Sequence, residues 1–447
     1  MHAQGSGDIT TPLLDRRFLG LAMMEFWERF AMAGVKSLLV LLLVDQVFAG
    51  DTAQAAWAGT LRAMYEGWFG RASPVALASQ VYGYAGALLY LSVPVGGLIG
   101  DLFANRRVLV HAGAAAMLVG LLLMVQVRGF LPGLALFMAA TGTVKGNLSV
   151  QLGQLYPDEA LRQRGYAAYL GFLNGGVICG PLVCGTLAAL AGWSYALGAA
   201  ALAVAIGMVG YAASGGRGDA AAAQGAGPRP DPARVAGSRA TAILITVILS
   251  VYFCWAAYEQ LGDIFLVWAR GHIALHIAGW QMPVGWFASL DGLFTLLLIA
   301  MMQALMPWLA RRGVVLGADR SIMLGGVSCA CGYGLLALAS AGGGTALSML
   351  WALGYILLID IAVVLVWPSG LSLIAAVAPP RYAGWWTGIF YLHGFFASLW
   401  AGLSGSFYGH MPDTRFWLLQ AGVAGGGVLL ALIAVMLVRD QATTTSA

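Results

Sequence analysis

Residues 346–377 read ALSMLWALGYILLIDIAVVLVWPSGLSLIAAV and contain a single charged side chain, Asp360. About 20 apolar residues are enough for a helix to cross the hydrocarbon core of a bilayer. Stretches of this kind recur along the 447 residues of the chain, of which 60% are hydrophobic and only 9% are charged. Soluble domains carry about 25% charged residues, so the composition predicts an integral membrane protein.

Twelve apolar stretches are long enough to be transmembrane helices. They are continuously apolar rather than alternating, which favours helices over a β-barrel. We therefore expect an all-α polytopic membrane protein, with residues 48–78 as an outer loop. The predicted spans cover residues 18–46, 79–102, 107–127, 130–152, 164–190, 193–212, 241–269, 283–309, 321–341, 346–377, 383–408 and 414–438.

One polar stretch interrupts this pattern. Residues 214–239, SGGRGDAAAAQGAGPRPDPARVAGSR, are rich in Gly, Ala, Pro and Arg and predict a flexible cytoplasmic linker. The linker separates six spans in residues 1–213 from six spans in residues 240–447. Two halves of this kind are typical of transporters whose substrate site lies between the halves near mid-membrane.

Positive charges are distributed unevenly over the predicted loops. If both termini are cytoplasmic, fifteen of the 23 Lys and Arg residues lie on the cytoplasmic side, five on the outer side and three within spans. Cytoplasmic loops are enriched in Lys and Arg. We therefore expect a multi-pass protein of the cytoplasmic membrane with both termini inside, surrounded by lipid and monomeric.

Three ionisable residues share one face of the first span, within EFWERF (25–30). Glu25, Glu28 and Arg29 have the spacing i, i+3 and i+4. A charge at mid-bilayer costs about 2.5–3.5 kcal/mol on insertion scales, so such groups are expected to be functional. We interpret the three as facing a water-filled cavity; the alternative is an ion pair that only locks helices together.

Further charged residues fall within later spans. Lys145 in TGTVKGN requires an anionic partner, and Glu259 in WAAYEQ is the natural one, unless the lysine extends to the membrane surface. Asp291 and Asp360 either face a cavity or are neutral and hydrogen-bonded to a neighbouring helix. His393 is interpreted mainly as a packing residue.

Buried carboxylates beside cations can couple transport to protons. Burial favours the neutral carboxyl, while a nearby Arg or Lys favours the charged one, so such groups can exchange protons near neutral pH. The five cysteines lie in apolar segments and predict neither a disulfide nor a metal site. No nucleophile–base pair, cofactor motif or nucleic-acid-binding pattern is present, so we expect no enzyme and no cofactor besides the proton gradient.

The motifs around these charges resemble the proton-dependent oligopeptide transporter family (POT/PTR) of the major facilitator superfamily. EFWERFAMAG (25–34) is similar to E-x-x-E-R-F-x-Y-Y-G, and TGTVKGN (141–147) is similar to G-x-G-x-x-K-P-N. The other matches, in chain order, are YLSVPVGGLIGDLFANRR (90–107), YLGFLNGGVICGP (169–181), WAAYEQ (255–260), SLDGLF (289–294) and WPSGLSLIAAVAPPRYAG (367–384). The ordered set implies the major facilitator fold.

The resemblance also implies roles for the charged residues. Glu25, Glu28 and Glu259 would be proton-coupling groups. Arg29 and Lys145 would bind the substrate carboxylate. Lys145 and Glu259 would in addition form a gating salt bridge between the halves.

Five other positions acquire roles in the same way. Tyr90 and Asn174 would line the substrate site, and Phe390 stands where the family often has a pocket tryptophan. Asp101 and Arg107 would stabilise the cytoplasmic gate.

The sequence departs from the family pattern at several of these motifs. The two tyrosines after E-R-F-x are replaced by Met32 and Ala33, and the proline after the lysine by Gly146. The glutamate that holds the peptide amine on the tenth helix is replaced by Val363. Asp291 stands where the family has an asparagine and could substitute as the amine-binding residue.

The sequence thus predicts a secondary active transporter. The leading interpretation is proton-coupled symport of small peptides or related carboxylate-bearing solutes by alternating access. The alternatives are a diverged transporter or exporter of another small solute, and a membrane receptor or scaffold that no longer transports.

Overall fold

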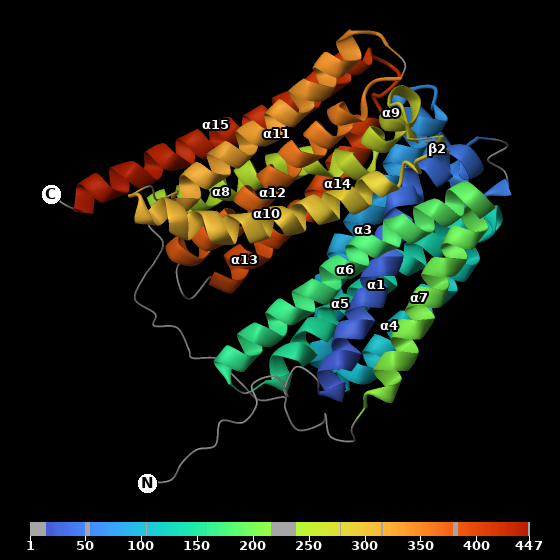
Figure 1. Cartoon of the computed structure of the whole chain (residues 1–447), viewed down its shortest axis with the longest axis horizontal. Coiled ribbons are helices and arrows are strands. Elements are labelled where there is room, and N and C mark those ends of the chain that lie inside the picture. The colour runs from blue at the N-terminus through green and yellow to red at the C-terminus, as the bar shows by residue number, and fades with distance from the viewer. Residues whose placement is uncertain are drawn as a thin grey trace. The chain divides into compact units, whose positions relative to one another are not determined.

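The structure is a computed structural model of the chain and is helical almost throughout the residues that it describes (Figure 1). These are residues 15–49, 54–103, 105–156, 158–215, 238–277, 279–313, 316–344, 346–378 and 383–445. Within them, two strands of two residues each, β1 (His276–Ile277) and β2 (Trp280–Gln281), form an antiparallel hairpin. Apart from its ends, the predicted linker 214–239 lies outside the described residues.

The chain separates into two compact units. Unit 1 comprises residues 1–38, 51–59 and 88–225, and unit 2 comprises residues 39–50, 60–87 and 226–447. Residues 39–50 and 60–87, which we assigned to the first half from sequence, therefore belong to unit 2. The two six-helix halves with a boundary at the linker stay a prediction.

Unit 1 is built mainly from five long helices and half of a sixth. It holds most of α1 (Arg16–Leu42), the second half of α3 (Pro74–Leu102), α4 (Arg106–Met124), η4 (Val127–Gly129), α5 (Phe130–Leu155), α6 (Glu159–Ala191) and α7 (Trp193–Ala213). Helix α4 packs against α5 and α7, and α6 packs against α5 and α7. On α7, Ala200, Val204 and Tyr211 are buried, whereas Leu202 and Val209 are exposed. Such exposed apolar side chains suit lipid rather than water.

Unit 2 contains the remaining helices. It holds the end of α1 with η2 (Leu43–Val47), most of α2 (Ala58–Phe69), the first half of α3, α8 (Ser238–Tyr258), η5 (Glu259–Gly262), α9 (Ile264–His272), the hairpin, α10 (Trp286–Arg311), α11 (Ala318–Ala341), α12 (Met349–Val377), α13 (Ala383–Tyr391), α14 (His393–Gly405) and α15 (Asp413–Thr445). Helix α11 packs against α12 and α15, and α8 packs against α12, α14 and α15, side by side in Figure 1. An aromatic cluster of Phe265, Trp268, Tyr333, Tyr355 and Trp417 is fully buried in this unit.

Eleven described helical segments are long and apolar enough to cross a membrane, and they coincide with eleven of the predicted spans. The chain is thus a multi-pass membrane protein with an all-α fold. The other predicted span, 383–408, is divided into α13 and α14 at Leu392. The break has a local cause: the N–H of Leu392 bonds to Ile389 three residues back, and the His393 ring nitrogen Nδ1 bonds to the carbonyl of Phe390 at 2.7 Å. Such a tightened turn interrupts the regular helical ladder.

Two further differences from the sequence prediction concern helix continuity. The predicted span 241–269 is interrupted by the 3₁₀ turn η5, after which Asp263 leaves helical geometry with φ −112° and ψ −106°. Short 3₁₀ turns inside a helix often mark functional hinges. The stretch 48–78, predicted as a loop, contains α2, whose Trp68 and Phe69 are exposed while Tyr65 is buried.

Candidate functional site

The three charged residues of EFWERF form a compact cluster in unit 1. Arg29 Nε lies 2.6 Å from Glu28 Oε2 and 3.1 Å from Glu25 Oε1, and Arg29 Nη2 donates to Glu28 Oε1 at 3.1 Å. The three residues are at most 8% exposed. One guanidinium therefore pairs with two buried carboxylates, and the predicted shared face of α1 exists.

Tyr169 on α6 completes this cluster, and sequence reasoning assigned it no role. Its hydroxyl donates to Glu25 Oε2 at 2.5 Å, and the residue is 7% exposed. The signal was available, because Tyr169 is the first residue of the quoted motif YLGFLNGGVICGP. Glu25 thus forms an ion pair with Arg29 and accepts a hydrogen bond from Tyr169. Among the described contacts, Glu28 accepts hydrogen bonds from Arg29 alone.

A glycine lets α6 approach α1 directly behind the cluster. A Cβ atom at Gly176 would lie 2.3 Å from the Phe26 carbonyl oxygen and 2.7 Å from Arg29 Cβ. Contacts this short are forbidden, so only glycine permits the close approach of the two helices. This close approach holds the backbone of Arg29 beside the helix that carries Tyr169.

Lys145 on α5 is half-buried near the same cluster. It interacts electrostatically with Glu28, Glu25 and Arg29, yet no carboxylate of the described part of unit 1 lies within 4.0 Å of its ammonium group. Within the described part of unit 1, Arg29 therefore forms ion pairs with two carboxylates of the protein, whereas Lys145 forms none.

Helix packing explains the glycine at position 146, which follows this lysine in place of the family proline. A Cβ atom at Gly146 would lie 2.6 Å from the backbone nitrogen of Gly97 and 2.8 Å from the Val93 carbonyl oxygen, both on α3. The backbones of α3 and α5 thus meet beside Lys145, and a proline ring would not fit there.

The two residues expected to line the substrate site also lie in unit 1. Tyr90 on α3 and Asn174 on α6 are both half-buried. The Asn174 amide donates to the carbonyl of Leu170 on its own helix at 2.8 Å. The carbonyl oxygen and the second N–H of this amide are the parts of the side chain that a ligand could use.

The predicted gate residues Asp101 and Arg107 contact different partners. Asp101 forms an ion pair with Arg106, whose other guanidinium nitrogen donates to Asn147 at 2.9 Å. Arg107 donates to the Tyr211 carbonyl at the end of α7 at 2.5 Å and lies over the Tyr211 ring at 4.7 Å. Sequence reasoning missed Arg106, since two adjacent arginines in ANRR are equivalent in sequence.

Glu259, in unit 2, lies on η5 and is 2% exposed. It accepts a hydrogen bond from the Tyr82 hydroxyl at 3.4 Å. Its predicted salt bridge with Lys145 of unit 1 stays a prediction.

The remaining predicted site residues of unit 2 lie on α10 and α13. Asp291 is half-buried and accepts a hydrogen bond from the Tyr258 hydroxyl, which lies 3.3 Å from each carboxylate oxygen. Phe390 is fully buried and packs against the rings of Trp367 and His393. Phe390 therefore belongs to the packed interior in this structure.

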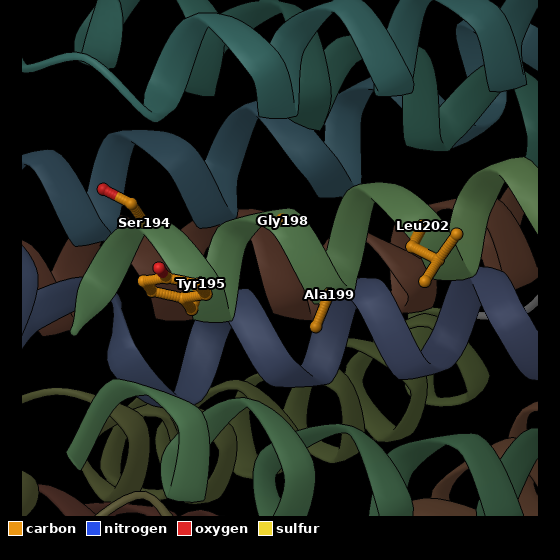
Figure 2. A pocket seen from close by; sticks show the side chains of 5 residues that line it. All are labelled: Ser194, Tyr195, Gly198, Ala199 and Leu202. Atoms are coloured by element: carbon orange, nitrogen blue, oxygen red, sulfur yellow. The ribbon is translucent and has the colours of Figure 1, made fainter. Parts of the chain in front are cut away.

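A surface pocket lies on α7, and its lining residues include none of the site residues described above. Figure 2 shows that its lining residues all come from this one helix: Ser194, Tyr195, Gly198, Ala199 and Leu202. None of them is charged. Among the described residues, no group of three or more His, Cys, Asp or Glu side chains could hold a metal ion.

Comparison with known proteins gives the chain a family. A family model described as "Major Facilitator Superfamily" matches residues 30–402. The chain belongs to this superfamily. Similar proteins include the peptide transporter YePEPT of Yersinia enterocolitica, which is 24% identical over 94% of this chain and 92% of that protein.

Solved structures of POT transporters have the same fold as this chain. The crystal structure of peptide transporter POT in complex with sulfate has a TM-score of 0.79 at 18% identity, covering 97% of this chain and 99% of that one. A POT family transporter in complex with 5-aminolevulinic acid has a TM-score of 0.78 at 17% identity, covering 94% and 96%. The resemblance to the proton-dependent oligopeptide transporters is thus confirmed, and so is the all-α major facilitator fold.

Proposed function

We propose that this protein is a secondary active transporter that couples the uptake of a peptide-like, carboxylate-bearing solute to protons. The observation that carries the proposal is the pairing of Arg29 with both Glu25 and Glu28 in a buried cluster. The named activity of the relative YePEPT is peptide transport, and 5-aminolevulinic acid, bound in one similar structure, carries both a carboxyl and an amino group.

The cluster explains how a proton and a substrate could be coupled. Arg29 cannot bind a substrate carboxylate with full strength while it makes a bidentate pair with Glu28. A proton on Glu28 removes the charge of the bidentate partner and leaves Glu25 as the ionised carboxylate of the cluster, so the side of the guanidinium that faced Glu28 becomes available to the substrate. Release of the proton restores the pair and expels the substrate carboxylate. Binding of the proton and of the substrate thus favour each other.

The other cation of unit 1 fits the same chemistry. Lys145 has no carboxylate within direct reach in the described part of unit 1, so it is available as a second ligand for the substrate carboxylate. In another state of the cycle it would pair with Glu259.

We place the protein in the cytoplasmic membrane as a monomer with both termini inside.

Uptake of a labelled peptide library into proteoliposomes tests the proposal. Peptides should accumulate when an inward proton gradient is imposed and only equilibrate without one. Accumulation of peptides that is independent of the gradient would contradict symport. The absence of both uptake and exchange for every peptide would contradict the substrate class.

A further inference from the structure

A histidine and an aspartate meet at the end of unit 2 where α9 ends and α15 begins. His272 Nε2 lies 3.2 Å from Asp413 Oδ2, and both side chains are half-buried. The other ring nitrogen of His272, Nδ1, lies 2.9 Å from the carbonyl oxygen of Trp268, one turn back on α9. Both nitrogens of one ring therefore face oxygen atoms that accept hydrogen bonds.

These two contacts assign a charge to the His272 ring. A carbonyl oxygen and a carboxylate only accept hydrogen bonds, so each ring nitrogen has to carry a proton in order to bond its partner. A neutral imidazole has one N–H, and its other nitrogen would direct a lone pair at an oxygen atom. Only the imidazolium, with a proton on both nitrogens, bonds Trp268 and Asp413 at once.

The positions of the two residues favour the same charges. His272 lies in the last turn of α9, and Asp413 lies in the first turn of α15. The C-terminal end of a helix stabilises a cation and the N-terminal end an anion. The buried Trp268 ring also stacks on the His272 ring, with centroids 5.3 Å apart and 16° between the planes. The face of an indole attracts a cation, which again suits the imidazolium.

The other charged and titratable groups at this end of unit 2 leave the pair intact. The Tyr408 hydroxyl donates to Asp413 Oδ2 at 3.3 Å, so the same carboxylate oxygen accepts from two groups. Arg270 of α9 is paired with Asp45 of η2 at 2.6 Å. Three further groups of the neighbouring segments are exposed: His276, His410 and Arg415.

We infer that His272 is a proton-binding site and that its proton fastens α9 to α15 as a pH-sensitive latch. Histidine ordinarily exchanges its proton between about pH 5 and 8. Without that proton, Nε2 would direct a lone pair at Asp413, and the attraction between the two helix ends would be lost. The latch therefore closes in acid and opens in alkali. It holds the far end of the segment that follows η5, the turn that carries Glu259.

The medium that the latch senses follows from the proposed orientation. Helix α8 begins at Ser238, next to the predicted linker, and α9 ends at the opposite end of the same predicted span. With both termini inside, His272 faces the outer medium, from which the protons for symport are taken. This placement rests on the proposed function, whereas the latch itself does not.

Thermal unfolding of the protein in lipid nanodiscs at about pH 5.5 and 8.5 tests the latch, since these values bracket most of the ordinary range of histidine. His272→Gln should lower the Tm by about 1–4 °C at the acidic pH and leave it unchanged at the alkaline one. In an Asp413→Asn background the same change should have no effect at either pH. His276→Gln, at an exposed histidine of the hairpin, is the matched control and should keep the wild-type Tm at both.

Three results would overturn the latch: no loss in His272→Gln at the acidic pH, an equal loss at both pH values, or a loss that persists in the Asp413→Asn background. If His272→Gln does not fold, hydrogen–deuterium exchange of the wild-type protein takes its place. After correction for the intrinsic effect of pH on exchange, the amides of residues 269–275 and 414–418 should exchange faster at the alkaline pH. Equal corrected rates would refute the latch. These measurements involve no transport, so the proposed function stands or fails independently of them.

Discussion

Replacing Glu28 by Gln tests whether the arginine-bound cluster couples transport to protons. Glu28 holds Arg29 through two charge-assisted contacts of 2.6 and 3.1 Å in a buried setting. Each such hydrogen bond contributes about 1.5–3 kcal/mol. A glutamine offers one acceptor oxygen, so the variant keeps at most one of the two contacts, in which only the guanidinium is charged. The interaction of residue 28 with Arg29 weakens by about 1.5–3 kcal/mol or more, or roughly tenfold to more than a hundredfold.

Two consequences follow for Glu28→Gln in proteoliposomes. Accumulation driven by a proton gradient should disappear, because the group that binds the proton is gone. Counterflow exchange should persist in part, with a half-saturating substrate concentration at alkaline pH about tenfold lower or more, because Arg29 has lost its bidentate carboxylate partner. Glu66→Gln, at an exposed glutamate of α2, is the matched control and should behave like wild type. Undiminished gradient-driven accumulation in Glu28→Gln would refute the coupling role of Glu28.

Three further predictions concern single contacts. Tyr169→Phe removes the donor to Glu25 and should slow gradient-driven uptake about fivefold to 150-fold, for a loss of about 1–3 kcal/mol; an unchanged initial rate would contradict this role. Lys145 and Glu259 should come within salt-bridge distance in at least one end state, and structures of both end states with separations above about 8 Å, the Debye length at physiological salt, would exclude the gate. Asp291→Asn should weaken binding of an unmodified peptide, measured by competition, far more than binding of its N-acetylated form, whereas equal losses would show that Asp291 does not bind the amine.

The membrane spans could be predicted because transfer of a helix into lipid depends on local composition. Eleven spans coincide with the predicted ranges for this reason. The charged face of α1 was equally accessible, since the spacing of Glu25, Glu28 and Arg29 fixes their common direction. The breaks at η5 and Leu392 could not be predicted from the sequence, because they depend on side-chain and turn contacts such as that of His393 with Phe390. Polar residues occur at both breaks, such as Glu259 at η5 and His393 after Leu392, but a polar residue within a span does not by itself interrupt a helix.

The site was predictable in its charged members and not in its polar partners. A charged residue within a span indicates a functional site because its insertion into the bilayer is unfavourable, whereas a tyrosine such as Tyr169 is common in apolar helices. Likewise, the choice of Arg106 over Arg107 as the partner of Asp101 depends on the direction in which α4 leaves the preceding loop. These contacts are properties of the packed structure.

The buried acids of the two units differ in what holds them, and the difference bears on how protons are used. In unit 1 an arginine bonds Glu25 and Glu28, so a proton on Glu28 competes directly with a cation. In unit 2 hydroxyls bond the acids, as Thr295 does for Asp360. A hydroxyl donates to a carboxylate or accepts from a carboxylic acid, so it accommodates both protonation states without rearrangement. Protonation of Glu28 leaves Arg29 with Glu25 as its ionised partner in the cluster, and a substrate carboxylate can then take the place of Glu28. The hydroxyl-bonded acids of unit 2 release no cation when they bind a proton. Only in the first kind of site does the proton free a cation for the substrate, and we therefore propose that the coupling of transport depends on the arginine-bound cluster.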